Sequence, residues 1–157
     1  MSGVSRRDFL LGWIKKIKNN LQELTDLPDI LKKVDKIINS EKYEEAKKIL
    51  QDLCKKYPNS IELKRRLAIT LYKSNEEQKA YTLFKELGKQ KDNLSFLYLA
   101  VIEGEKNDDK TTLFYLKKFF DPQNITLQRE INLNIALYES KDISFKELIN
   151  NIKKLLP

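Results

Sequence analysis

The sequence predicts an all-α fold in which about nine helices form antiparallel hairpins. Three observations lead to this prediction. Apolar residues recur three and four positions apart along nearly the whole chain, and strict alternation of apolar and polar residues is rare. Glycine and proline occur four times each in 157 residues, too rarely for the many tight turns of an all-β fold. Turn and capping residues recur at regular intervals, and the short connections favour antiparallel neighbours.

The first predicted helix covers residues 9–24 and is amphipathic. At about 100° per residue its apolar side chains fall on one face, while most of its lysines lie outside that face. A turn is expected at Asp26-Leu27-Pro28, because helices usually end before the residue that precedes a proline. Residues 1–25 are therefore predicted to form a segment of their own. The apolar face consists of Phe9, Leu10, Trp13, Ile14, Ile17, Leu21 and Leu24.

The remaining helices follow a repeat of 32 to 34 residues. A period of this length is the sequence signature of stacked helical hairpins. The second helix of each pair carries a small residue, then a large apolar residue four positions later. The matching sets are Tyr43, Ala46, Leu50, Leu53 and Pro58; then Glu77, Ala80, Phe84 and Leu87; then Thr112, Leu116 and Phe119. The preceding helices match at Leu67-Ala68, Leu99-Ala100 and Ile135-Ala136.

This pattern resembles the tetratricopeptide repeat, a family whose 34-residue unit is a pair of antiparallel helices. The resemblance covers about 130 residues and implies a right-handed α-solenoid with units at about 27–60, 61–92, 93–124 and 129–157. Residues 61–92 match best. The first unit has Lys33-Val34 where the family has a large and a small residue, and Thr112 and Leu148 replace the small residue in the last two units.

Packing explains why this pattern needs small residues. Ala68, Ala80 and Ala100 are expected to let helix axes approach closely, and large apolar side chains such as Phe84 then fill the space between hairpins. No single hairpin can bury its own apolar face, so stability is a sum of contacts between neighbours.

The resemblance implies a protein-interaction module or adaptor that binds a peptide on the concave surface lined by the first helices. The partner would be an extended or helical segment with apolar anchors and some acidic character. The alternative is that the apolar residues of this surface are core, covered by the terminal helices. The predicted partner-binding residues are Arg65, Arg66, Ile69, Tyr72, Lys73, Leu97, Tyr98 and Val101.

The N-terminal segment has three interpretations. In the first, the segment is a helix that packs on the first hairpin. In the second, it lies in the interface of an anionic membrane. In the third, it is recognised by an export system. Ser5-Arg6-Arg7-Asp8-Phe9-Leu10 looks like the twin-arginine motif, but Lys15-Lys16 end the apolar run that should follow, and no small-residue cleavage site appears. The predicted targeting or membrane residues are Arg6, Arg7, Phe9, Leu10, Trp13, Lys15 and Lys16.

Charge and composition limit the function further. The net charge is +7, with +4 in residues 1–20, −1 in 21–40, +4 in 41–93 and zero in 94–157. There is no histidine, no glycine-rich phosphate loop and one cysteine, Cys54, so we expect no enzyme, no metal and no cofactor. Without a recognisable motif, nucleic acid is an improbable partner. We expect a cytoplasmic protein; the alternative is a peripheral membrane or export-linked chaperone at the inner face of the membrane.

Overall fold

The computed structural model describes residues 6–157, and within its first helix it describes the side chains of residues 7, 8, 11, 12, 14, 15 and those from 26 onward. The described part is all-helical, with eight helices and no strand. It divides into two compact units, of which the first ends at Lys42 and the second spans Tyr43–Pro157. We describe each unit by itself.

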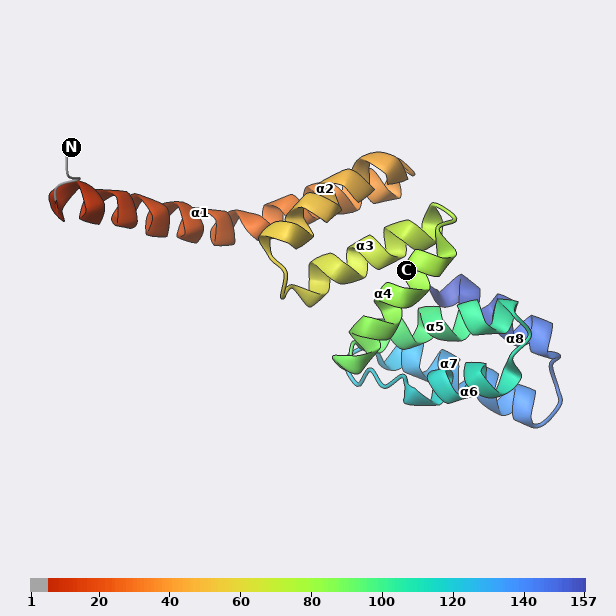
Figure 1. The fold of residues 1–157 in the computed structure, drawn as a ribbon. Coiled ribbons are helices and arrows are strands. Elements are labelled where there is room, and N and C mark those ends of the chain that lie inside the picture. The colour runs from red at the N-terminus through yellow and green to blue at the C-terminus, as the bar shows by residue number, and fades with distance from the viewer. Residues whose placement is uncertain (1–5) are drawn as a thin grey trace. The chain divides into compact units, whose positions relative to one another are not determined.

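The first unit is one long helix, α1 (Arg6–Asn39) (Figure 1). The break predicted at residues 26–28 is wrong, because α1 runs through Pro28, and the described part therefore has eight helices rather than nine. Proline lacks an N–H group, but its fixed φ is compatible with a helix. Leu31, Val34 and Ile38 are buried. Within the described residues, no helix combines the length and the apolar character needed to cross a bilayer.

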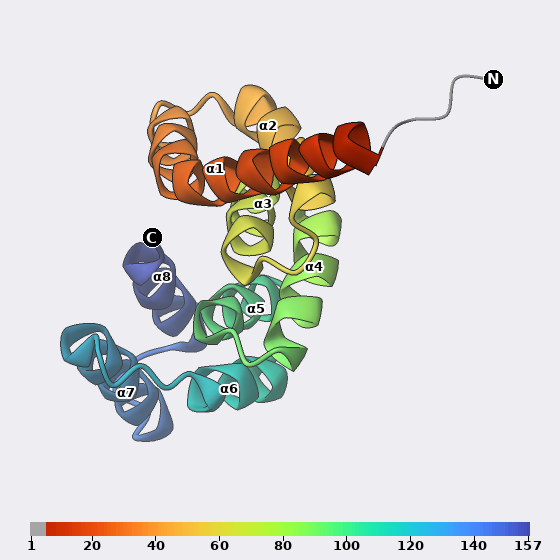
Figure 2. The ribbon, with the colours of Figure 1, turned by 90° about the vertical axis from the view of Figure 1, so that its left-hand side faces the viewer.

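The second unit contains seven helices that pack mostly in sequence order. Each of the first five packs against the next, which gives the stacked antiparallel hairpins of a helical-repeat solenoid (Figure 2). The helices are α2 (Tyr43–Lys56), α3 (Ile61–Lys73), α4 (Glu77–Lys89), α5 (Asn93–Glu105), α6 (Asp109–Lys118), α7 (Ile125–Glu139) and α8 (Phe145–Leu155).

The same turn closes α1, α3, α4, α5 and α7. Each turn has one residue in the left-handed region, and the amide of the following residue donates to the carbonyl oxygen five positions back, as in Asp92 N to Leu87 O at 3.1 Å. An acidic side chain then caps the next helix at two of these turns: Asp92 accepts from the amide of Ser95, and Asp108 from that of Thr111. The left-handed residues are Glu41, Asn75, Lys91, Asn107 and Lys141.

The predicted packing of small against large residues is confirmed. Ala68, Ala80 and Ala100 have no exposed surface, and Phe84 is equally buried. Thr112, which replaces a small residue, is also buried, and its hydroxyl donates to the carbonyl oxygen of Ala100 at 3.2 Å. A hydroxyl is tolerated in this core because it has a hydrogen-bond partner.

The C-terminal hairpin departs from the regular stack. α8, not α7, packs along α5, whereas α7 contacts α6 less extensively than α4 contacts α5 (Figure 2). Leu148 and Ile152 of α8 are fully buried in a cluster with Leu97 and Val101 of α5. The predicted match of Ile135-Ala136 to the large-small pair is wrong for the small residue, because Ala136 is exposed. The second helix of this hairpin therefore takes the position next to α5.

Candidate protein-binding site

α3 supplies five of the predicted partner-binding residues. The helix begins after Ser60, whose hydroxyl accepts from the amide of Leu63 at 3.3 Å. Because the helical repeat is about 3.6 residues, Arg65, Ile69 and Tyr72 fall on one row along α3, with Arg66 and Lys73 beside it. The structure leaves all five partly exposed.

The three predicted contact residues on α5 lie in the core instead. Leu97, Tyr98 and Val101 have exposed fractions of 0%, 1% and 0%. Leu97 and Val101 share a buried cluster with residues of α8, and the Tyr98 hydroxyl donates to the carbonyl oxygen of Pro157 at 2.8 Å. The arrangement is the alternative that the sequence left open, in which terminal helices cover the apolar surface.

Tyr98 is held between two aromatic rings. It stacks on Phe84 at a centroid distance of 4.6 Å and meets the edge of Tyr72 at 5.4 Å. Burial raises the pKa of Tyr98 well above its ordinary value, and it also raises the pKa of Tyr72. A sequence signal for this burial existed: residues 96–102 are apolar without interruption, and a helix that is apolar all round is buried.

Arg65 has a structural role that the sequence did not suggest. Its guanidinium pairs with Asp92, donating through Nε at 2.8 Å and also through a terminal nitrogen. The Asp92 carboxylate is 2% exposed and also accepts from the hydroxyl of Ser95 at 2.5 Å. Arg65 therefore compensates a buried negative charge that caps α5.

Beside Tyr72 lies a second charged contact. Lys153 of α8 donates to Glu105 of α5 at 2.5 Å. The hydrogen bond to Glu105 is the main reason why the pKa of Lys153 is raised. This pair links α8 to the C-terminal end of α5. It also brings a further cation close to the row of Arg65, Ile69 and Tyr72 on α3, which we call the inner row.

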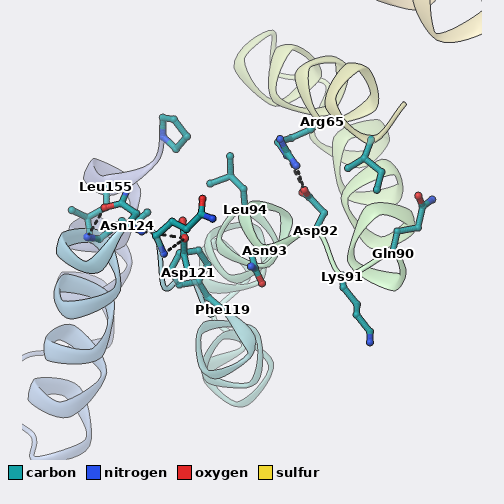
Figure 3. Close-up of a pocket in the computed structure, with 14 residues that line it drawn as sticks. Arg65, Gln90, Lys91, Asp92, Asn93, Leu94, Phe119, Asp121, Asn124 and Leu155 are labelled. Carbon is teal, nitrogen blue, oxygen red and sulfur yellow. Dashed lines mark hydrogen bonds and ion pairs between the residues drawn. The ribbon is translucent and has the colours of Figure 1, made fainter. Parts of the chain in front are cut away.

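An open pocket of about 720 Å³ lies at the N-terminal ends of α3, α5 and α7 and the C-terminal end of α8 (Figure 3). Arg65 connects it to the inner row of α3. Its apolar walls include Ile61, Leu94, Leu127 and Leu155, and carboxamides surround them. Sequence reasoning missed this site, because the packing of α8 against α5 brings the end of the chain there. The carboxamide residues are Gln90, Asn93, Gln123 and Asn124.

Among the described residues, no three His, Cys, Asp or Glu side chains come together to hold a metal ion. Cys54 of α2 is partly buried, and desolvation raises the pKa of its thiol, so the reactive thiolate is disfavoured.

The predicted targeting residues lie at the start of α1. Arg7 and Lys15 are exposed, and so are their apolar neighbours Leu11 and Ile14. Ser5, the first residue of the twin-arginine-like motif, lies outside the described residues. The side chains of the other predicted targeting residues are not described either: Arg6, Phe9, Leu10, Trp13 and Lys16.

Comparison with known families agrees with the helical pairs described above. Residues 38–101 match the family model of the tetratricopeptide repeat. This part of the chain is similar to tetratricopeptide repeats. Tetratricopeptide repeats are generally protein–protein interaction modules. No curated protein and no solved structure matches the chain. The matched range includes α3 and α4 and ends at Val101 within α5, so it holds the best-matching predicted unit and the whole inner row of α3.

Proposed function

We propose that this chain is a non-catalytic adaptor that binds an acidic peptide segment with apolar anchors, along α3 and in the adjoining pocket. The observation that carries the proposal is the open pocket of about 720 Å³, of which Arg65 forms one wall. Ligand sites in proteins are typically concave, and polar groups on their walls fix the orientation of the ligand.

The chemistry of the lining favours a peptide. A carboxamide both donates and accepts hydrogen bonds, so Gln90, Asn93 and Gln123 can pair with the amides and carbonyls of an extended backbone. Leu94 and Leu127 offer apolar surface for anchoring side chains. Tyr72 and Ile69 extend this surface along α3.

The charge of the inner row favours an acidic partner. Arg66 and Lys73 lie on α3, whereas the charge of Lys153, beside Tyr72, is compensated by Glu105. Glu62 is the one acidic residue between Ile61 and Lys73. Complementary charge speeds association and selects among partners more than it adds affinity.

A selection from a phage-displayed library of random 12-residue peptides tests this proposal. We expect the enriched peptides to combine Asp or Glu with aliphatic or aromatic residues. Asn93→Asp places a carboxylate in the pocket at the first turn of α5, where a negative charge suits the helix dipole and the fold. We expect this variant to bind an enriched peptide about threefold to tenfold more weakly.

The matched control is Gln78→Glu, which makes the same change of charge at an exposed position of α4 outside this pocket. It should leave peptide affinity unchanged. Enriched peptides without acidic residues, or equal affinities for Asn93→Asp and the unmodified chain, would contradict the proposal. Arg65 is unsuitable for this test, because its removal would leave Asp92 buried without its cation.

A further inference from the structure

The two halves of α1 share one apolar spacing, but the described side chains on it differ in exposure. Leu31 and Ile38 are seven residues apart and both are buried. The same seven-residue step continues toward the N-terminus at Leu10, Ile17 and Leu24. In that earlier half, Ile14 is the one member of the apolar face whose side chain the structure describes, and its exposed fraction is 45%. A methyl group added at Gly12 would meet no atom within 4 Å.

Charge divides α1 in the same place. Residues 1–20 carry a net charge of +4, whereas residues 21–40 carry −1. The basic residues therefore belong to the half that contains the exposed Ile14. A basic, amphipathic helix with aromatic residues on its apolar face is typical of helices that lie in a membrane interface. The aromatic residues here are Phe9 and Trp13.

We propose that residues 6–25 of α1 lie along the surface of an anionic bilayer, with the apolar face in the acyl region and the lysines at the headgroups. On a helix, Lys18 projects beside one edge of the apolar face and Lys16 beside the other, whereas Lys15 projects on the polar side. The ammonium groups of Lys16 and Lys18 can therefore reach the headgroups while their stems cover apolar surface. Pairing with a second copy is less favourable, because it would bring two segments of net charge +3 together. This proposal is independent of the peptide site on α3.

Flotation of the full chain with vesicles tests the proposal. One set of vesicles is phosphatidylcholine alone, and the other contains about one third phosphatidylglycerol. We expect binding to the anionic vesicles at low salt, loss of binding at high salt, and little binding to the neutral vesicles. Trp13 is the single tryptophan of the chain, so its fluorescence reports on α1. Its emission should shift to shorter wavelength on anionic vesicles, and lipids brominated on the acyl chain should quench it.

Two variants and two matched controls locate the contact. Ile14→Asp and the double variant Lys15→Glu/Lys18→Glu should each weaken partition into anionic vesicles about tenfold or more. Leu133→Asp changes an apolar residue of similar exposure, 52%, in α7, and Lys110→Glu/Lys146→Glu reverses two exposed charges in α6 and α8. Both controls should bind like the unmodified chain. Circular dichroism would establish that all four variants fold.

Three results would overturn the proposal. Equal recovery of the unmodified chain in the unbound fraction with both vesicles would exclude a lipid contact. If the α1 variants and their controls lost binding to anionic vesicles equally, the lipid contact would not lie on α1. Sedimentation of the lipid-free chain as a dimer that Ile14→Asp dissociates would assign the open face to a second copy.

Discussion

The hairpins α3–α4 and α7–α8 have the same local design but stack differently. Both contain two helices joined by a turn with one left-handed residue, Asn75 in the first and Lys141 in the second. In the first hairpin α4 continues the stack onto α5, whereas in the second it is α8 that packs back onto α5. Turn chemistry therefore determines that a hairpin forms, and the residues on its faces determine where it docks.

The docking faces of the two hairpins differ in side-chain size and polarity. α3 and α4 meet through Ala68 and Ala80, both fully buried. In the second hairpin Ala136 is exposed, and the two helices are joined by a polar pair in which Asn151 Nδ2 donates to Asn134 Oδ1 at 2.9 Å. α7 has no buried small residues that would let a neighbouring helix approach closely. This explains why α7 does not take the position next to α5.

The largest expected effect comes from placing a large side chain among the buried small residues of the α3–α4 hairpin. Ala80→Trp should lower the free energy of unfolding by about 3 kcal/mol or more, since the buried site has no room for an indole. Ala136→Trp makes the same change in the C-terminal hairpin, where the side chain is exposed, and should cost less than about 0.5 kcal/mol. Urea denaturation monitored by circular dichroism measures both. Equal losses in the free energy of unfolding would show that the two hairpins do not differ in the packing of their small residues.

Breaking the buried ion pair should have the next largest effect. Arg65→Ala leaves the Asp92 carboxylate buried without its cation, and we expect a loss of about 2–3 kcal/mol in the free energy of unfolding. Lys117→Ala removes one partner of the exposed pair between Lys117 and Glu139 and should cost at most about 0.5 kcal/mol. A small loss in Arg65→Ala would mean that Ser95 alone satisfies Asp92.

Gly104 tests the contact between α5 and α8. A Cβ atom at this position would lie 2.1 Å from Cδ1 and 2.6 Å from Cγ1 of the buried Ile149. Gly104→Ala should therefore destabilise the chain by about 1–2 kcal/mol, despite the better helix propensity of alanine. Gly12→Ala, at an open position of α1, should instead leave stability unchanged or raise it slightly. Thermal unfolding compares the two, and stabilisation by Gly104→Ala would contradict the close approach of α8.

Acid should produce the smallest of these effects. The backbone amide of Ser144 donates to Glu147, and this lowers the pKa of the Glu147 carboxyl below its ordinary value. A carboxyl with a lowered pKa in the folded state stabilises at neutral pH, and this contribution is lost as the pH falls through that pKa. Glu147→Gln should therefore show a flatter decline in stability between about pH 5 and pH 3. Parallel curves for the two proteins would show that this cap of α8 contributes nothing.

Local features of the fold could be predicted from the sequence, and long-range ones could not. The repeat predicted the hairpins and the burial of Ala68, Ala80 and Ala100, since these depend on neighbouring helices. The continuity of α1 through Pro28 was missed, because one lost hydrogen bond does not oblige a helix to end. Of the proposed site, the sequence predicted only the residues along α3. The pocket depends on α8 reaching α5, and hairpin periodicity contains no information about that contact.

The contact between α8 and α5 changes how the repeats unfold together. In an open row of repeats, each hairpin touches only its neighbours, and the ends can fray without disturbing the middle. Here Tyr98 is hydrogen-bonded to Pro157, 59 positions later, and Glu105 to Lys153, 48 positions later. These long-range hydrogen bonds link α8 and the C-terminus directly to α5, in the middle of the row of repeats. Hydrogen exchange in α5 and α8 should then occur as one cooperative event, with the last helix as protected as the middle of the array.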